Sequence, residues 1–306
     1  MKNVSPIVVL LMTLIMGTAS QAASLPVVRV SSKIDTEGAL LGNIIQQVLE
    51  NKGIKTADKV QLGATKVVRA AITAGEIDIY PEYTGNGAFF FSEETDPAWK
   101  NAKAGYERVK KLDFDRNKIV WLDPAPANNT WSIALRKDVA AAHHLKSLTD
   151  LGKWIAGGGS FKLAASAEFV ERPDALPAFE SAYGFKLKQD QLLTLAGGDT
   201  TVTIKAAAEQ TSGVNAAMAY GTDGPVAALG LVTLSDPKGV QPIYAPTPII
   251  RADTLARYPG IRAALKPVFA SLNGPTLQAL NAKIAIEGQD ARSVARNYLK
   301  SKGFIH

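Results

Sequence analysis

Short strand-like runs alternate with helix-like runs along most of the chain, and this alternation constrains the fold more than any other feature. Residues 27–31 are a short apolar run, the pattern of a strand. In 40–49 the apolar residues recur at helical spacing, and Gly53 follows as a stop signal. The alternation predicts an α/β protein with largely parallel sheets. Further strands are predicted at 60–62, 77–80, 119–122, 131–135, 161–165 and 214–220, and further helices at 67–73, 98–112, 147–155, 173–183, 199–210, 253–258, 261–272, 276–287 and 290–302.

Two proline-bearing segments interrupt this alternation. Residues 123–130 contain two prolines, and residues 240–250 contain three. Proline holds φ near −65° and has no N–H donor, so neither segment is expected to be helical. The chain is long enough for two lobes. We therefore expect these segments to be a pair of hinge crossings between them.

The amino terminus predicts the compartment. Lys2 is the only charge before an apolar run at 7–19, and small residues follow at 19–24. This is the pattern of a secretory signal peptide, which we place at residues 1–22 with cleavage after Ala22. The apolar run is shorter than the ~20 residues that a membrane span needs. A membrane anchor or a buried first helix is the alternative.

Cysteine and charge narrow the class of protein further. The sequence has no cysteine, so disulfides, thiolate nucleophiles and zinc–cysteine sites are excluded, and no cysteine can carry a lipid. We expect a freely diffusing periplasmic protein rather than a lipid-anchored one. The formal net charge is +6, but the basic residues are scattered among acids. No nucleic-acid partner is predicted from such a pattern.

Residues that could support catalysis are sparse. Of the three histidines, His143 and His144 lie in an Ala-rich polar stretch and His306 ends the chain. No Gly-x-Ser-x-Gly elbow, phosphate-binding loop, dinucleotide-binding turn or zinc-ligand spacing occurs in the sequence. Asp78 and Glu82 are the nearest approach to paired acids, and at this spacing in an extended segment they need not converge. The sequence therefore predicts neither an enzyme, nor a cofactor, nor a metal site.

Four aromatic residues lie at strand ends or in the crossing segments, where open α/β sheets place ligands. They are Tyr83, Trp131, Tyr220 and Tyr244. Ordinary core packing is the alternative for any one of them. Together they could form a cage, because electron-rich ring faces attract a cation that cannot donate hydrogen bonds.

One basic residue, Arg172, stands out by its context. It follows a predicted strand and precedes a helix predicted to begin at Pro173. A guanidinium there could bind a carboxylate with two parallel hydrogen bonds, and the amino end of a helix would add a favourable field. The alternative is a salt bridge with Glu171 or Asp174.

Six segments resemble one protein family. They are residues 32–38, 80–86, 126–131, 168–174, 219–224 and 244–246, and they include the run Tyr-Pro-Glu-Tyr-Thr-Gly at 80–85. In this order they resemble the substrate-binding proteins of the glycine betaine, choline and proline betaine ABC importers. The resemblance runs over essentially the whole mature chain.

The resemblance implies a periplasmic binding protein fold of type II-like architecture. Two α/β lobes would be joined by two crossing strands, with the ligand in the cleft. Lobe 1 would comprise residues 23–131 plus 241–306, and lobe 2 residues 132–240. The protein would capture a quaternary-ammonium osmoprotectant by lobe closure and deliver it to the membrane permease subunits of an ABC importer. We expect a monomer. An enzyme on a similar fold and an envelope chaperone are the competing hypotheses.

The resemblance also implies roles for particular residues. Tyr83, Trp131, Tyr220 and Tyr244 would surround the methylated ammonium group. Arg172 and Lys33 would meet the ligand's carboxylate. The ligand-binding set also includes Asn86 and Asn129.

Three residues depart from the family's pattern. Trp131 stands where a tyrosine is usual, which reshapes the cage but keeps its cation–π character. Asn86 stands where a threonine hydroxyl often binds the carboxylate, and Gly38 stands where some members have glutamine. We expect these changes to affect ligand identity and affinity more than fold or class.

Overall fold

The computed structural model describes Met1 and residues 26–306. The predicted signal peptide at 1–22, apart from Met1, lies outside the described residues, as do residues 23–25 of the predicted first lobe. Within the described part of the chain, no helix combines the length and the apolar character needed to cross a bilayer.

The first lobe is built on a five-stranded sheet with the order β2-β1-β3-β10-β4. β1 pairs in parallel with both β2 and β3, and β10 runs antiparallel between β3 and β4. The strands are β1 (Val28–Lys33), β2 (Thr56–Gly63), β3 (Ile79–Tyr83), β4 (Ile119–Trp121) and β10 (Pro246–Arg251).

The second lobe repeats this arrangement in a sheet with the order β7-β6-β8-β5-β9. β6 pairs in parallel with β7 and β8, and β5 runs antiparallel between β8 and β9. The strands are β5 (Trp131–Arg136), β6 (Leu163–Ser166), β7 (Leu192–Leu195), β8 (Ala216–Tyr220) and β9 (Leu231–Thr233). In both sheets the antiparallel strand is the one that has just crossed from the other lobe.

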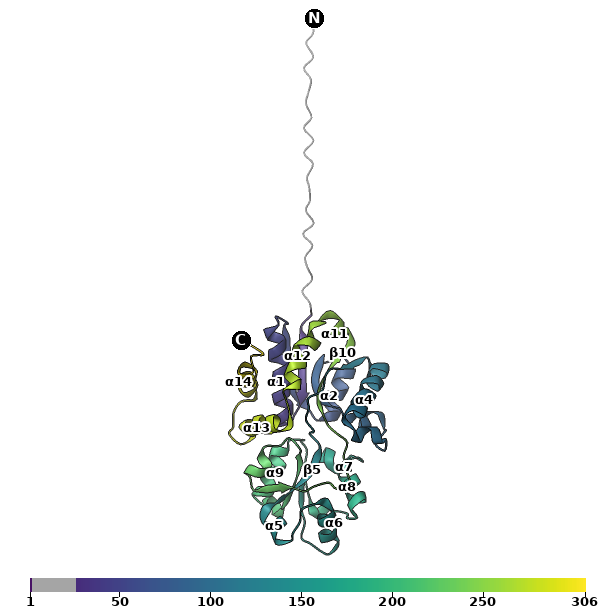
Figure 1. Ribbon diagram of the computed structural model, residues 1–306, viewed down its shortest axis with the longest axis vertical. Helices are drawn as coiled ribbons and strands as arrows, with labels where there is room; N and C mark the ends of the chain where they lie inside the picture. The colour runs from purple at the N-terminus through teal and green to yellow at the C-terminus, as the bar shows by residue number, and fades with distance from the viewer. Residues whose placement is uncertain (2–25) are drawn as a thin grey trace.

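Two segments outside the sheets and helices, 122–130 and 234–245, connect the lobes (Figure 1). They hydrogen-bond to each other near the lobe junction, where the Asn129 N–H donates to the Tyr244 carbonyl at 2.9 Å. The Tyr244 N–H in turn donates to Oδ1 of Asn128 at 2.8 Å. The predicted architecture of two α/β lobes joined by two crossings is confirmed.

Among residues 26–306, eight α-helices surround the first sheet. α1 is enclosed most completely, because α12, α13 and α14 from the end of the chain pack on it, and every residue of α1 from Glu37 to Leu49 is buried. The carboxyl-terminal helices thus complete the lobe that the first part of the chain begins. The helices are α1 (Thr36–Asn51), α2 (Thr65–Thr73), α3 (Asn86–Phe91), α4 (Ala102–Asn117), α11 (Ala252–Arg257), α12 (Gly260–Ala270), α13 (Gly274–Ala285) and α14 (Ala291–Ser301), with a 3₁₀ turn at Pro97–Lys100.

In the described part of the chain the second sheet carries six α-helices, the longest of them nine residues. Its core includes Phe169, Phe179 and Met218, all of them fully buried. Tyr83 and Tyr244 pack against this core although they come from β3 and from a crossing. The helices are α5 (Lys137–Ala142), α6 (Leu148–Ala156), α7 (Ala167–Glu171), α8 (Leu176–Tyr183), α9 (Thr200–Ala208) and α10 (Pro225–Ala228), with 3₁₀ turns at Gln189–Gln191 and Thr211–Gly213.

The helix predicted at 173–183 begins later than expected, at Leu176. Arg172 is extended, with φ −70° and ψ 127°, because a residue that precedes proline is disfavoured in the helical region. It therefore follows the end of the short α7. The prediction that Arg172 lies at the amino end of a helix is wrong.

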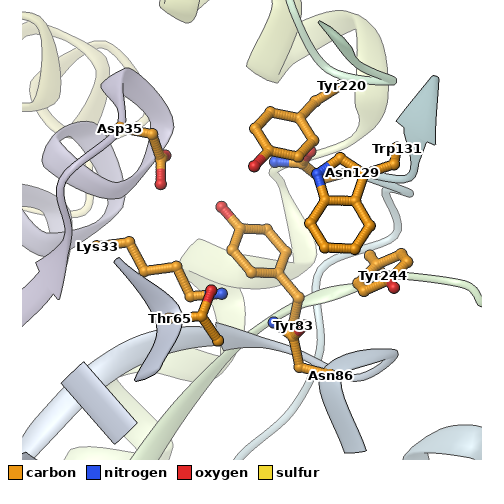
Figure 2. Close-up of a pocket in the computed structure, with 9 residues that line it drawn as sticks. All are labelled: Lys33, Asp35, Thr65, Tyr83, Asn86, Asn129, Trp131, Tyr220 and Tyr244. Carbon is orange, nitrogen blue, oxygen red and sulfur yellow. The ribbon is translucent and has the colours of Figure 1, made fainter. Parts of the chain in front are cut away.

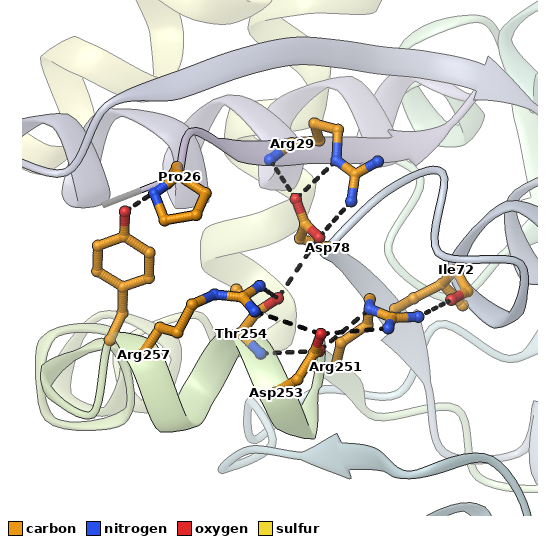
Figure 3. A network of polar contacts seen from close by, with 9 residues as sticks. Pro26, Arg29, Ile72, Asp78, Arg251, Asp253, Thr254 and Arg257 are labelled. Carbon is orange, nitrogen blue, oxygen red and sulfur yellow. Dashed lines mark hydrogen bonds and ion pairs between the residues drawn. The ribbon is translucent and has the colours of Figure 1, made fainter. Parts of the chain in front are cut away.

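A polar network lies at the end of the first lobe farthest from the second lobe (Figure 3). Asp78 accepts three hydrogen bonds of 2.7–2.8 Å from the backbone and guanidinium of Arg29. Thr254 of α11 approaches the same carboxylate at 3.4 Å. These contacts hold α11 against β1 and the segment before β3. Asp78, one of the two acids considered for catalysis, thus has a structural role in holding these elements together.

Candidate functional site

A cavity lies between the lobes, at the junction of the two crossings, and its empty space, including the part open to solvent, is about 330 Å³. Its lining includes every residue predicted to bind ligand except Arg172, and adds two that were not predicted, Asp35 and Thr65. The lining residues are Lys33, Asp35, Thr65, Tyr83, Asn86, Asn129, Trp131, Tyr220 and Tyr244.

Strand pairing brings the aromatic residues together. Trp131 begins β5 and lies opposite Tyr220 at the end of β8. Their rings are 6.4 Å apart at an interplanar angle of 21°. The ring of Tyr244, from the second crossing, is 5.7 Å from that of Trp131 at 58°. Tyr83 ends β3 and completes the lining from the first lobe (Figure 2). Both lobes therefore contribute a ring.

The electrostatic character of this lining suits a cation without hydrogen-bond donors. Burial raises the pKa of Tyr83, Tyr220 and Tyr244 above the ordinary value of tyrosine, so all three stay neutral phenols near neutral pH. Their faces and that of Trp131 carry the negative side of the ring quadrupole. In contrast, the residues that the structure describes hold no cluster of His, Cys, Asp or Glu suited to a metal ion.

Glu37, in the first turn of α1, holds several lining residues in place. The hydroxyl of Tyr83 donates to its Oε1 at 2.9 Å, and Nδ2 of Asn129 donates to the same oxygen at 2.7 Å. Nδ2 of Asn281 in α13 donates to Oε2 at 2.8 Å. The sequence showed only an acid in the first turn of a helix, which is common. Nothing in its spacing indicated these three distant partners.

A second buried carboxylate, Glu82, positions the polar side of the cavity. Nζ of Lys33 is 2.6 Å from its Oε1. Nδ2 of Asn86 donates to the same oxygen at 2.7 Å, and the hydroxyl of Tyr80 donates to Oε2 at 2.8 Å. The Lys33 ammonium also lies 4.7 Å from the centre of the Tyr83 ring. Lys33 and Asn86 thus reach the cavity with much of their hydrogen-bonding capacity already used.

Arg172 lies beside the cavity rather than in its lining. Its Nε and Nη2 each donate to the Asp174 carboxylate at 2.7 Å, the partner that the alternative interpretation named. Its Nη1 donates to Oδ1 of Asn86 in the first lobe at 2.9 Å. The guanidinium carbon is 4.5 Å from the centre of the Trp131 ring. In this structure Arg172 supports the cage and bridges the lobes.

Asp35 and Thr65 enter the lining from the amino ends of α1 and α2. Asp35 is the N-cap of α1, and its Oδ1 accepts from the Gly38 N–H at 2.7 Å. Thr65 is the first residue of α2, whose N-cap position is an alanine. Asp35 followed by an acid in the first turn is a readable helix-start signal, but that signal predicts only capping.

The lobes touch at several points around the cavity. The hydroxyls of Thr36 and Thr201 are 3.1 Å apart. Nδ2 of Asn281 in α13 donates to the Thr222 carbonyl at 3.1 Å, and Nε2 of Gln278 donates to the Gly221 carbonyl at 3.0 Å. Helix α13 of the first lobe thus packs on the turn that follows Tyr220 in the second.

This contact leads to a prediction at Gly224. A Cβ at this position would lie 2.4 Å from the Gln278 carbonyl oxygen and 2.7 Å from the Ala282 Cβ, although the backbone (φ −68°, ψ −34°) accepts alanine. Gly224→Ala should therefore hold the lobes slightly apart and weaken ligand affinity roughly tenfold, the scale of a modest overpacking cost. Calorimetric titration of the variant with ligand measures the loss.

Gly198→Ala is the matched control, because no atom lies within 4 Å of a Cβ there. The unliganded melting temperature of Gly224→Ala should change little, since opening relieves the clash. Unchanged affinity in Gly224→Ala would contradict the inferred role of this contact in closure.

Comparison with known proteins gives a consistent result. A family model described as the substrate binding domain of ABC-type glycine betaine transport system matches residues 26–301. The glycine betaine-binding protein YehZ of Escherichia coli strain K12 is 70% identical over 288 residues, which cover 92% of this chain and 94% of that protein. A glycine-betaine-binding protein of Pseudomonas aeruginosa is 30% identical over 288 residues, covering 92% of this chain and 90% of that one.

A solved structure of a relative is also similar. Apo YehZ from Escherichia coli aligns with a TM-score of 0.67 at 71% identity, covering 92% of this chain and all of that one.

Proposed function

We propose that the cleft of this protein captures glycine betaine or a closely related quaternary amine for import. The proposal starts from the family: this chain belongs to the substrate-binding domains of ABC-type glycine betaine transport systems. The protein binds and releases its ligand and carries out no reaction on it. The observation that carries the assignment is the convergence of Tyr83, Trp131, Tyr220 and Tyr244 on one cavity between the lobes.

The methylated ammonium group would sit among these rings. It has no N–H to donate, so water solvates it weakly and ring faces can replace that water. The carboxylate of a betaine would lie on the side of Lys33 and Asn86, with Asn129 as a further polar contact. Arg172 would contribute from behind Trp131, or turn from Asp174 towards the carboxylate when ligand is bound.

Lobe closure would couple capture to transport. Because rings from both lobes line the cavity, the full set of contacts exists only when the lobes are together, so ligand favours that state. The TM-score of 0.67 to a relative sharing 71% of its residues supports this proposal. Chains so alike are expected to share the fold of each lobe, and a hinge movement between the lobes would lower the score in this way.

The finer aspects of the proposal concern compartment, assembly and lobe limits. We place the mature protein in the periplasm as a monomer, released by cleavage of residues 1–22 and without a lipid anchor. It would dock on the membrane permease subunits of its importer. Lobe 1 would comprise residues 23–131 plus 241–306 and lobe 2 residues 132–240. In the structure, β5 of the second sheet already begins at Trp131.

A ligand series tests the proposed function directly. Glycine betaine and choline should raise the melting temperature of the mature protein by mass action, and calorimetry should detect their binding. Glycine, which lacks the three methyl groups, should neither raise the melting temperature nor show binding by calorimetry. Its N–H groups would lose their hydrogen bonds to water on entering the cage. A protein that bound glycine as well as glycine betaine, or neither quaternary amine, would refute the assignment.

A further inference from the structure

The Asp35 carboxylate lies in the ligand cavity, and the described part of the chain gives it no cationic partner. Its side chain points towards the space faced by the hydroxyls of Tyr83 and Tyr220 (Figure 2). The residue is 9% exposed. Its Oδ1 accepts the capping hydrogen bond from Gly38. Within residues 26–306, no ion pair is formed by Asp35 and no hydrogen bond is accepted by its Oδ2.

The charges facing Asp35 do not neutralise it. Lys33, the nearest basic residue, is already paired with Glu82 at 2.6 Å. Burial, followed by the neighbouring carboxylates, raises the pKa of Asp35 to about 6, although the Gly38 N–H and Lys33 act in the opposite direction. The charged or titratable groups around it are Lys33 on β1, Glu37 on α1, Asp199 at the start of α9, Tyr83 on β3, Tyr220 on β8 and Asp223 in the turn after β8.

We propose that Asp35 is a counter-ion for the bound quaternary ammonium group, and that it makes the site select cationic quaternary amines such as choline over zwitterionic ones such as glycine betaine. This inference rests on the proposed function. A monocation gains the full attraction of the carboxylate at short range in a dry cavity. In a betaine, repulsion between its own carboxylate and Asp35 offsets much of that gain.

The same placement links binding to protons. A bound cation favours the ionised form of Asp35, so it lowers the pKa of this group below its value in the empty protein. Binding of choline therefore expels a proton at and below about pH 6. The affinity for choline should rise with pH through this window and level off above it. The affinity for glycine betaine should change less over the same window.

Asp35→Asn tests the proposal without removing the helix cap, since asparagine caps helices about as well as aspartate. Choline and glycine betaine are titrated by calorimetry against the mature wild type and the variant at about pH 5 and about pH 7.5, on either side of the Asp35 transition. Asp290→Asn is the matched control, because Asp290 is an exposed N-cap of α14 that caps through Ser293 and does not line the cavity.

At the higher pH, Asp35→Asn should lower the choline affinity about tenfold or more and the glycine betaine affinity much less. It should also remove the pH dependence of choline binding, whereas Asp290→Asn should match the wild type. If Asp35→Asn lowered the affinity for both ligands equally, or if the wild type bound glycine betaine but not choline, the proposed role of Asp35 would be overturned. The proposed function would be unaffected by either result. A wild type that binds neither ligand would overturn the proposed function, and this inference with it.

Discussion

Replacing Trp131 by leucine is expected to weaken glycine betaine binding by about 30-fold or more, whereas tyrosine at this position should retain most of the affinity. Leucine fills much of the apolar volume but has no electron-rich face. A desolvated cation–π contact is worth about 2 kcal/mol, which corresponds to about a 30-fold change in affinity. Tyrosine keeps a ring between Tyr220 and Tyr244. Isothermal titration of the three proteins measures the difference.

Trp154→Leu is the matched control for this experiment. Trp154 belongs to the same lobe but packs on His143 and Phe161, with ring centres 4.8 and 6.5 Å away, and it does not line the cavity. Its replacement should leave the affinity unchanged. If Trp131→Leu bound glycine betaine like the wild type, or if Trp154→Leu lost as much affinity, binding by the aromatic cage would be refuted.

The second large effect is expected in stability, at Glu82. Glu82→Gln should lower the free energy of unfolding by about 3–5 kcal/mol, because it leaves the charge of Lys33 buried without its partner. The side chains of Lys33 and Glu82 are 9% and 0% exposed, and their charged atoms are 2.6 Å apart. Urea denaturation of the unliganded protein, with a linear extrapolation to water, measures the loss.

Two further variants separate this effect from a general response to lost charge. Glu107→Gln breaks an exposed pair with Lys110 and should cost about 0–1 kcal/mol. The side chains of Glu107 and Lys110 are 57% and 43% exposed. Adding Lys33→Met to Glu82→Gln should restore part of the lost stability, because the unpaired charge is then gone. A loss below about 1 kcal/mol in Glu82→Gln would show that this pair is not the buried contact described here.

Much of the fold was predictable because its signals are local. Strand-like runs and helical spacing predicted most of the elements and the α/β class, and the prolines of 123–130 and 240–250 indicated the crossings. β7 (Leu192–Leu195) was missed, since this short strand at the edge of its sheet is mostly half-exposed and carries no clear alternation. The prediction of a helix start at Pro173 is wrong, because residues 172–175 form a separate turn, closed by the Ala175 N–H and the Arg172 carbonyl, and the backbone of Ala175 is not helical.

The residues of the candidate site could be predicted from the sequence where their position at the end of a strand was enough to place them at the cleft. Tyr83 and Tyr220 end β3 and β8, and Trp131 begins β5. The carboxyl ends of the parallel strands and the amino end of the antiparallel β5 meet at the edge of the sheets that faces the cleft. Together with the family resemblance, this placed the four aromatic residues at one cavity, where the structure has them.

The spacing of side chains along the chain thus determines the two lobes, the crossings and the positions of the rings that line the cavity. Helical periodicity and strand ends depend on residues that are neighbours in sequence, so they can be predicted from the sequence alone. The partners of the buried charges depend on the folded chain. Arg172 reaches Asn86 across the cleft, and Glu37 binds Asn281 from the last part of the chain. Asp35 has no cationic partner among residues 26–306. A charge meets whichever group packing brings within hydrogen-bond distance, and in this protein many of those groups lie far away in sequence.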